Sequence, residues 1–417
     1  MQGIQDSEPL PELATPAEQT IDAGREQSRA AQSLPLSGIA RLRHPSPALS
    51  QTLALFGVTR LLLVLVTYVG YVLFNAGQYS PDSVGVTNLL FSWDRWDALW
   101  YEGIARAGYQ SATATAFFPL YPLLIRLGTL LFSSNTTYVV GLLVSNVAFF
   151  FMLWALRVLA ERELGSEAAS RAVLYLAVFP TALFFFAPYN ESLFVLLAVL
   201  CFLALRRERW WLAGLLGLLA VLTRSAGIFL AVPFLVEYGS RHGWQWRRLR
   251  VDGLAIALIP LGLALYSAYC WLQFGDPLAF SHAQTHWGRT LAWPWVGIWN
   301  QMLVIWHAQP ASFFEAHDLL DLAATVGVIA LVVLGWRRLP LSYSLYAAAL
   351  LATFLLFPLA FRDTLEANQR FALEVFPAFM TLGLLARRPA TQQAIVILFT
   401  GLLALLSLVF ITGRWLV

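Results

Sequence analysis

The stretch WDRWDALWYEGIARAGY at residues 93–109 places two carboxylates among aromatic side chains. Asp94 and Asp97 are three residues apart, so a helix at about 100° per residue would turn them to one side and its tryptophans to another. Neighbouring aromatic residues are Trp96, Trp100 and Tyr101. A carboxylate held there can take a proton from a hydroxyl group. The same pattern also fits a helix anchored at a membrane surface whose acids are simply solvated.

Further charged residues follow apolar runs along the chain. Glu191 stands in APYNES at residues 187–192, where a new apolar run begins. Arg224, Arg362 and Arg370 also lie at such ends, on the side that usually carries few basic residues. Taken singly, Glu191 is explained by the favourable interaction of an acid with the start of a helix. Each arginine is explained as an anchor whose long side chain reaches from the apolar region to the membrane surface. Taken together, they indicate a site that binds an anion.

The composition indicates a membrane protein. Only 12% of the 417 residues are charged, against about 25% in soluble proteins, and the mean hydropathy is +0.65. Many separate apolar runs predict an all-α, polytopic membrane protein, since the strands of a membrane barrel would alternate in polarity. The small positive net charge gives no reason to expect a nucleic-acid partner.

The arginine-bearing loops predict a topology. The positive-inside rule places residues 1–46 in the cytoplasm, as a disordered tail, and residues 47–417 form a single transmembrane domain. Loops at 75–137 and 274–318 are predicted outside. Residues 117–132 are predicted to lie at the outer face without crossing, because the arginines after residue 156 belong inside. About eleven crossings result.

Carboxylates and arginines beside lipid suit sugar transfer from a lipid-phosphate donor. A carboxylate would accept the acceptor's proton, and guanidinium groups would stabilise the departing phosphate. No glycine-rich phosphate loop is present, and D-x-x-D differs from the D-x-D of metal-dependent nucleotide-sugar enzymes. The sequence predicts no cofactor and leaves a divalent metal open. His282 and His286 could meet on a helix, but Gly275 and Pro277 favour a loop there.

Four blocks resemble one family in order. WDALWYEGIARAGY followed by AFFPLYPLLIRLG resembles the first outer loop of PIG-V-type mannosyltransferases. FPTALFFFAPYNESLFVLL is similar to the second block, although this chain has Asn190 where the family usually has serine. LTRSAGIFLAVPF and QRFALEVFPAF are similar to the third and fourth blocks. Each motif alone is weak, but four in order are specific.

The resemblance implies a GT-C fold, with interfacial helices in the first outer loop, and an inverting mannosyltransferase. Carried over by position, Asp97 would be the catalytic base or would orient the acceptor, with Asp94 as the second choice and Glu191 in support. Arg224, Arg370 and, by its position, Arg362 would hold the donor phosphate. The sugar or lipid passage would be lined by Trp96, Trp100, Tyr101 and Tyr189.

The expected function is therefore transfer of mannose from polyprenyl- or dolichyl-phosphate mannose to a glycolipid, glycan or protein acceptor. The site would face the extracytoplasmic side of the cell membrane, with membrane lipids, the lipid-phosphate sugar and the acceptor as partners. Two other classes remain as alternatives. One is a transporter or flippase of lipid-linked sugars, which would more often show mid-membrane charges and internal duplication. The other is a non-catalytic membrane partner subunit.

Overall fold

The structure is a computed structural model that describes residues 47–75, 85–131, 136–245, 250–360 and 364–414. Residues Pro47–Val417 form one compact unit. The predicted tail at 1–46 and the candidate Arg362 lie outside the described residues.

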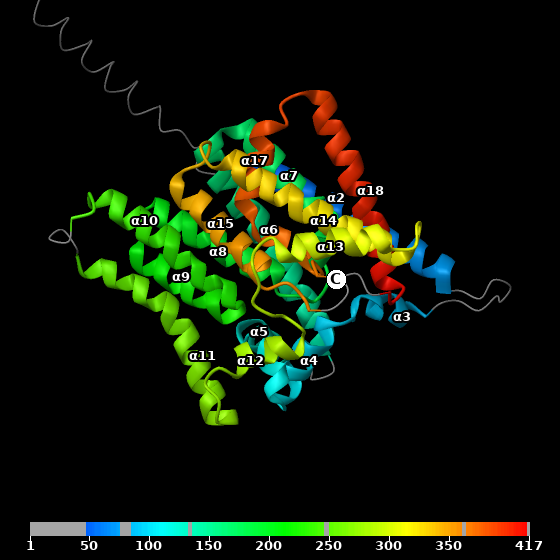
Figure 1. The fold of residues 1–417 in the computed structure, drawn as a ribbon, viewed down its shortest axis with the longest axis horizontal. Helices are drawn as coiled ribbons and strands as arrows, with labels where there is room; N and C mark the ends of the chain where they lie inside the picture. Colours follow the sequence, from blue (N-terminus) through cyan, green and yellow to red (C-terminus); the bar gives the residue numbers. More distant parts are fainter. Residues whose placement is uncertain (1–46, 76–84, 132–135, 246–249, 361–363, 415–417) are drawn as a thin grey trace, which may run out of the picture. The chain divides into compact units, whose positions relative to one another are not determined.

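The described residues are helical, as predicted, and contain no strand beyond a single bridge between Arg289 and Leu359 (Figure 1). The α-helices are α2 (Pro47–Asn75), α3 (Val86–Leu90), α4 (Asp97–Ala107), α5 (Leu120–Thr129), α6 (Thr137–Leu164), α7 (Ser166–Ala177), α8 (Glu191–Arg206), α9 (Trp210–Thr223), α10 (Ala231–Arg241), α11 (Leu258–Phe274), α12 (Ala279–His286), α13 (Val296–His307), α14 (Phe313–Gly335), α15 (Leu341–Leu356), α16 (Asn368–Phe371), α17 (Phe376–Leu385) and α18 (Pro389–Ile411). Short 3₁₀ turns are η1 (Phe91–Trp93), η2 (Ala112–Ala116), η4 (Ala182–Phe185), η5 (Ser225–Leu230), η7 (Val251–Ala257) and η8 (Ala372–Glu374).

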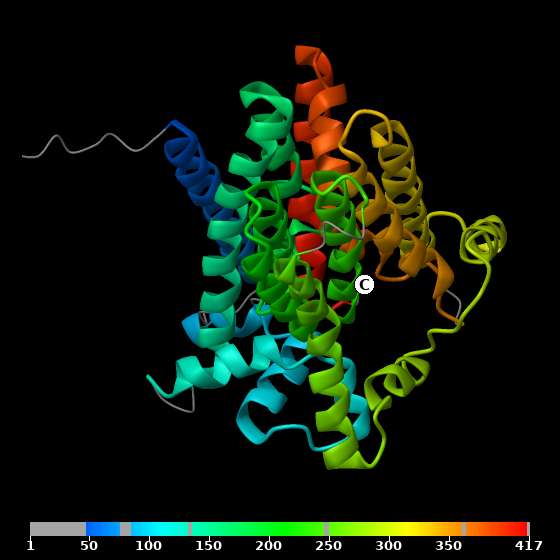
Figure 2. The ribbon, with the colours of Figure 1, turned by 90° about the vertical axis from the view of Figure 1, so that its left-hand side faces the viewer.

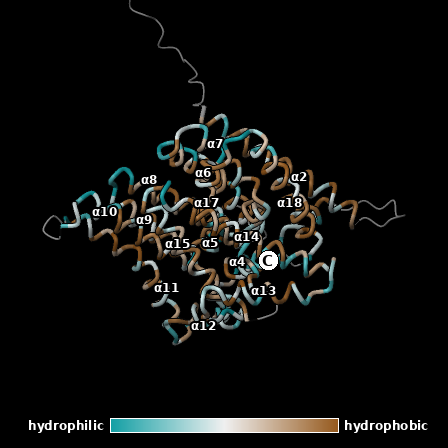
Figure 3. Tube along the Cα trace, turned by 45° about the horizontal axis from the view of Figure 1, so that its top comes forward, coloured by the Kyte–Doolittle hydropathy of each residue, from teal (hydrophilic) through white to brown (hydrophobic). Residues whose placement is uncertain are grey.

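Within the described residues, five helical segments are long and apolar enough to cross a membrane. They are Ala48–Phe74, Thr137–Leu164, Val251–Phe274, Phe313–Gly335 and Pro389–Ile411. Apolar residues cover the lengths of helices such as α2 and α18, whereas hydrophilic ones gather near ends such as that beside α10 (Figure 3). The chain is therefore a multi-pass helical membrane protein. Each predicted crossing contains a helix, but several of these are short, so the count of eleven stays a prediction.

Helix α5 occupies most of the segment that was predicted not to cross. Its 10 residues reach only about 15 Å at 1.5 Å per residue, half the thickness of the hydrocarbon layer. Tyr121, Pro122 and Ile125 are buried, while Leu123 and Leu127 are exposed. An apolar exposed face on so short a helix is what a helix lying along a bilayer surface would present.

Four helix ends meet around one arginine. Arg206, at the end of α8, donates to Glu163 of α6 at 2.8 Å and to Glu237 of α10 at 3.2 Å. Glu237 also accepts a hydrogen bond from Ser342, at the start of α15. These ends were all predicted to share the inner side. The ion pairs therefore hold α6, α8, α10 and α15 together at one end.

The elements of the first predicted outer loop lie together at the other end of the long helices (Figure 2, cyan). Tyr109, just after α4, donates a hydrogen bond to the carbonyl of Phe117 at 2.6 Å. Tyr266 of α11 donates to the carbonyl of Thr115 at 2.8 Å. The AFFP segment is thus tied both to α4 and to a long helix, which fixes the loop that carries Asp97.

The helical wheel predicted for residues 93–104 is wrong in its first turn. Trp93 closes η1, and α4 begins only at Asp97. Trp96 has φ 54° and ψ −114°, a conformation that costs a non-glycine residue about 1–3 kcal/mol and interrupts the helix. Trp93 is buried instead of interfacial, and its indole donates to Thr67 of α2 at 2.9 Å. This break separates the directions of Asp94 and Asp97.

Helix α9 packs closely against η7 and the start of α11 through glycines. A Cβ atom on Gly214 would lie 2.2 Å from the carbonyl oxygen of Ala255, and one on Gly217 would lie 2.6 Å from Ile259. A backbone oxygen cannot move away without shifting the helix, so we expect Gly214→Ala to destabilise the protein by about 1–3 kcal/mol. The measurement is the thermal midpoint of the purified protein in detergent.

Gly327→Ala on α14 is the matched control for this substitution. Nothing lies within 4 Å of a Cβ at Gly327, and alanine favours the helix by about 1 kcal/mol over glycine. We therefore expect Gly327→Ala to raise the midpoint slightly. Equal midpoints for the two variants would contradict the close packing of α9 against η7.

Candidate active site

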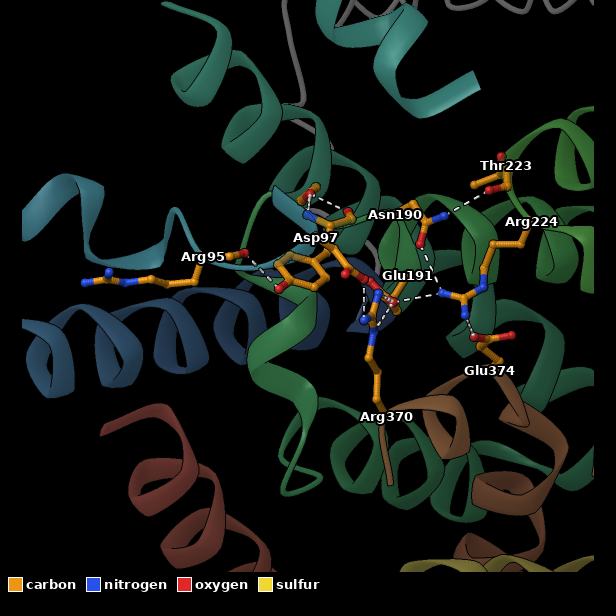
Figure 4. Close-up of polar contacts among 10 residues, drawn as sticks. Arg95, Asp97, Asn190, Glu191, Thr223, Arg224, Arg370 and Glu374 are labelled. Atoms are coloured by element: carbon orange, nitrogen blue, oxygen red, sulfur yellow. Dashed lines mark hydrogen bonds and ion pairs between the residues drawn. The ribbon is translucent and has the colours of Figure 1, made fainter. Parts of the chain in front are cut away.

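Arg370 joins two of the predicted site carboxylates. Its Nη1 lies 2.5 Å from Oδ2 of Asp97, and its Nε lies 2.6 Å from Oε1 of Glu191 (Figure 4). The three residues come from α16, α4 and α8 and are separated by up to 273 positions in the chain. The structure thus brings together three of the candidates that sequence analysis selected.

Arg224 extends this contact into a chain of charges. Its Nη1 donates to Oε1 of Glu191 at 2.9 Å and to the Asn190 side chain at 3.1 Å. Its Nη2 lies 3.0 Å from Oε1 of Glu374. We call the five residues Asp97, Glu191, Arg224, Arg370 and Glu374 the charged cluster (Figure 4). It alternates acid and base, with three carboxylates and two guanidinium groups.

The local fold explains why Glu191 and Arg370 can be buried. Glu191 is the first residue of α8, where free backbone N–H groups favour a negative charge. Arg370 lies over the rings of Tyr189 and Phe184, at 4.7 and 5.0 Å from their centres. The backbone N–H of Gln369 donates to Asp321 of α14 at 3.2 Å, which holds the short helix α16 in place.

Exposure differs sharply across the charged cluster. The side chains of Glu191 and Glu374 are fully buried, and Arg370 is 9% exposed, whereas Asp97 is 20% and Arg224 18% exposed. Burial lowers the pKa of Arg370, but the carboxylates of Glu191 and Asp97 outweigh it, so the pKa lies well above the ordinary value. Arg370 therefore stays charged, and Asp97 is the acid of the cluster that solvent or a substrate can reach.

Asp94 belongs to a different cluster of carboxyl groups. Its carboxyl hydrogen-bonds with that of Glu102, and Glu102 pairs with Arg106 at 2.8 Å. Burial raises the pKa of Asp94, and burial together with Asp94 raises the pKa of Glu102 to about 7. A hydrogen bond between two carboxyl groups requires one of them to be protonated. Asp94 therefore interacts with Glu102 of α4, whereas Asp97 pairs with Arg370.

We expect the stability of the protein to fall as the pH rises from about 4.5 to 7. Over this window the folded state keeps a proton on Glu102 that the unfolded chain, with its ordinary pKa, has lost. Glu102→Gln supplies a permanent hydrogen-bond donor and should flatten this dependence. The measurement is the thermal midpoint from pH 4.5 to 8.

Glu167→Gln, on the exposed side of α7, is the control for the pH series, since its side chain is 92% exposed. It should keep the wild-type slope. A wild-type slope retained in Glu102→Gln would show that the Asp94–Glu102 pair does not cause it.

The aromatic residues that were predicted to line the sugar or lipid passage take two kinds of position. Trp100 is half-buried and stacks on Phe117 with the ring centres 5.4 Å apart. Tyr101 and Tyr189 are buried, and the Tyr189 hydroxyl donates to the carbonyl of Arg95 at 3.0 Å. Trp96 is half-buried just before Asp97. Trp96 and Trp100 can therefore meet a substrate, whereas the two tyrosines shape the walls around Asp97 and Arg370.

The histidines of the second predicted outer loop differ from expectation in structure. His282 and His286 lie on helix α12, where a loop was predicted, because the turn at Gly275 ends before Ala279. His282 pairs with Asp276 at 2.7 Å. Across the described residues, no three histidine, cysteine or acidic side chains are grouped closely enough to hold a metal ion.

Two residues of this region were not among the predicted site residues: Glu374, which belongs to the charged cluster, and Arg289, which lies beside it. Glu374 follows Arg370 by four residues within the fourth block, a spacing that could have singled it out. Arg289 lies in the loop after α12, and its guanidinium is 5.0 Å from the ring centre of Phe371. Nothing in the sequence around Arg289 connects it with α16.

The fold and the site together define the class of this protein. It is a multi-pass helical membrane protein in which buried carboxylates and arginines converge from four segments. Residues 73–240 match the family described as Mannosyltransferase (PIG-V), which confirms the resemblance to PIG-V-type mannosyltransferases. The matched region contains Asp97, Glu191 and Arg224, whereas Arg370 and Glu374 lie beyond it.

Curated relatives agree with the family match. The chain is 32% identical over 212 residues to GPI alpha-1,6-mannosyltransferase 2 of Homo sapiens, covering 46% of this chain and 43% of that protein. It is 29% identical over 222 residues to the Cricetulus griseus protein of the same name, covering 48% and 44%. The chain therefore matches less than half the length of these relatives.

A solved structure shows a more distant likeness. ArnT from Cupriavidus metallidurans, bound to undecaprenyl phosphate, aligns with a TM-score of 0.39 and 16% identity, over 79% of this chain and 76% of that one. That TM-score leaves the GT-C fold a proposal.

Proposed function

We propose that this protein is a membrane mannosyltransferase that takes mannose from a polyprenyl- or dolichyl-phosphate donor. The proposal includes a GT-C fold with eleven crossings, an extracytoplasmic site and a glycolipid or glycan acceptor. The family match and the names of the relatives support the sugar and the reaction class. A lipid-linked donor suits a site whose surroundings are apolar helices.

The observation that carries the proposal is the exposure of Asp97 together with its ion pair to Arg370. It is the most accessible acid of the charged cluster, it begins a helix in the WDALWY motif, and Arg370 holds its Oδ2 at 2.5 Å. The ion pair with the buried guanidinium of Arg370 holds the Asp97 carboxylate in one orientation, as a positioned base must be held. One oxygen is held while the other is left to meet the acceptor.

The reaction we propose is a one-step displacement. The acceptor oxygen attacks the anomeric carbon of mannose while its proton passes to Asp97. The bond between that carbon and the phosphate oxygen breaks, and its electron pair leaves with the polyprenyl phosphate. Attack from the face opposite the leaving group inverts the anomeric configuration. No nucleotide is needed.

Glu191 and Arg370 receive revised roles within this proposal. Glu191 is fully buried and contacts both arginines, so it positions them and does not touch the acceptor. Arg370 orients Asp97. Arg224 is the cluster's more exposed guanidinium and can still approach a donor phosphate, although Glu191 and Glu374 already occupy it. Asp94 is no longer a candidate base, since Glu102 binds it on another side of α4.

The test is a transfer assay with purified protein in lipid vesicles. Radiolabelled polyprenyl-phosphate mannose is incubated with the protein and a lipid extract, beside the same donor carrying glucose. Label that moves from the mannose donor to a new product would support the proposal and identify the acceptor. Donor left intact for every sugar tried, with the protein folded, would overturn it and favour a transporter or a partner subunit.

A further inference from the structure

The charged cluster lacks a free cation for a phosphate group. Arg370 is held by Asp97 and Glu191, and Arg224 by Glu191 and Glu374. Each guanidinium group of the cluster is therefore already shared between two carboxyl groups. A lipid phosphate that approached only these residues would meet like charges, which is unfavourable in a partly buried site.

Arg289 is the arginine next to this cluster that has no carboxylate partner among the described residues. Its guanidinium donates to two backbone carbonyls, those of Phe357 at 3.0 Å and Glu366 at 3.4 Å. Arg224 and Arg289 both contact the ring of Phe371, at 5.1 and 5.0 Å from its centre. Phe371 thus connects Arg289 with the charged cluster. The two carbonyls are uncharged, so they do not neutralise the positive charge of Arg289.

The electrostatic surroundings of Arg289 favour a nearby anion. Loss of contact with water, together with the nearby Arg224 and Arg370, lowers its pKa to about 10 against a rise from Glu366. The side chain is nevertheless half-exposed. A bound anion would relieve this repulsion and could reach the guanidinium from the surface.

Arg289 also stands beside the end of an apolar groove. The segment after it is paired with the end of α15, where Ala292 N–H donates to the carbonyl of Leu356 at 2.9 Å. Leu355 and Pro294 line a cavity of ≈ 740 Å³ that follows α15 back to Ala348 and is closed on the other side by the last turn of α14. Arg337 and Arg338 lie at the far end of the groove.

We propose that Arg289 binds the phosphate of the lipid-phosphate donor, and that the polyprenyl tail of the same molecule lies in the groove between α14 and α15. The inference rests on the proposed function and assigns its donor site. A guanidinium group with free N–H donors is suited to binding a phosphate. The branched, apolar polyprenyl tail is suited to a groove lined by leucine, valine and alanine. The phosphate would then lie near Phe371, beside the charged cluster.

The site predicts a binding difference that needs no sugar transfer. Undecaprenyl phosphate and its uncharged match, undecaprenol, are titrated onto the purified protein in nanodiscs and counted by native mass spectrometry. Arg289→Gln should weaken the phosphate lipid on the order of tenfold and leave undecaprenol unchanged, because one charge-assisted contact is lost. Arg126→Gln, an exposed arginine on α5, is the matched control and should bind both lipids as wild type does.

A second variant tests the groove. Ala352→Trp fills it from α15 and should weaken both lipids, whereas Ala54→Trp, on the exposed face of α2, should weaken neither. Unchanged binding in Arg289→Gln together with Ala352→Trp would overturn the inference. Loss of the phosphate lipid in Arg337→Gln instead of Arg289→Gln would also overturn it, since the headgroup would then lie at the far end.

Failure of this inference can be told apart from failure of the proposed function. Wild-type protein that transfers mannose, with an Arg289→Gln variant of unchanged apparent KM for the donor, would refute the donor site alone. Wild-type protein that binds undecaprenyl phosphate through Arg289 but transfers no sugar would refute the transferase and keep the binding site.

Discussion

Asp97→Asn should reduce mannose transfer by about 10²–10⁴-fold, the usual contribution of a positioned general base. Asparagine has nearly the same shape and can still accept a hydrogen bond from Arg370, so the fold around α4 should persist. It cannot take the acceptor's proton. The measurement is the initial rate of label transfer at saturating donor, with the thermal midpoint determined on the same preparation.

The matched control for this substitution is Asp276→Asn, in the second predicted outer loop. Asp276 pairs with His282 on α12 and is far along the chain from the charged cluster. It should keep its activity. An Asp97→Asn protein that folds and transfers mannose at the wild-type rate would sink the assignment of the base, whatever the reaction's other details.

Arg370→Gln should cost the protein about 3–5 kcal/mol of stability and all measurable transfer. The substitution leaves the fully buried Glu191 with Arg224 alone and leaves Asp97 unpaired, and uncompensated charge in a low-dielectric interior is expensive. Arg370→Lys should recover little, because an ammonium group cannot reproduce contacts from Nε, Nη1 and Nη2 at once. Thermal midpoint and transfer rate are measured together.

Stability and activity separate in the double variant Arg370→Gln/Glu191→Gln. Neutralising Glu191 as well removes the fully buried carboxylate, and only the more exposed Asp97 stays without its partner, so the midpoint should recover part of the loss. Transfer stays absent because Asp97 is no longer oriented. A double variant as unstable as Arg370→Gln alone would indicate that Arg370 stabilises the fold through its contacts with Tyr189 and Phe184 instead of its charge.

The sequence predicted helix positions and several site residues for physical reasons that act locally. Long apolar runs and arginine-bearing loops mark helices and their ends, and Asp97, Glu191, Arg224 and Arg370 stand out because charge beside lipid is costly. The wheel for residues 93–104 failed because Trp96 leaves the helical conformation and Trp93 is buried against α2, and periodicity reports neither.

The sequence could not predict which residues the charged side chains of the site pair with. Asp94 and Asp97 share a motif, yet one pairs with Glu102 and the other with Arg370, because the helix begins between them. Arg289 lies in a loop with no motif and reaches the site only through a backbone pairing with residues 356–360. Such long-range contacts depend on the whole arrangement of helices.

The distribution of the charged cluster along the chain has a consequence for biosynthesis. Asp97, Glu191 and Arg224 are synthesised first, and Arg370 and Glu374 emerge only near the carboxyl end. Until then Glu191 has one cationic partner, Arg224, with which it can enter the bilayer as a pair. The later segment brings one positive and one negative charge together, so its insertion leaves the net charge of the cluster unchanged. A nascent chain halted before residue 370 would thus carry the helices from α2 to α15 but neither α17 and α18 nor a finished site.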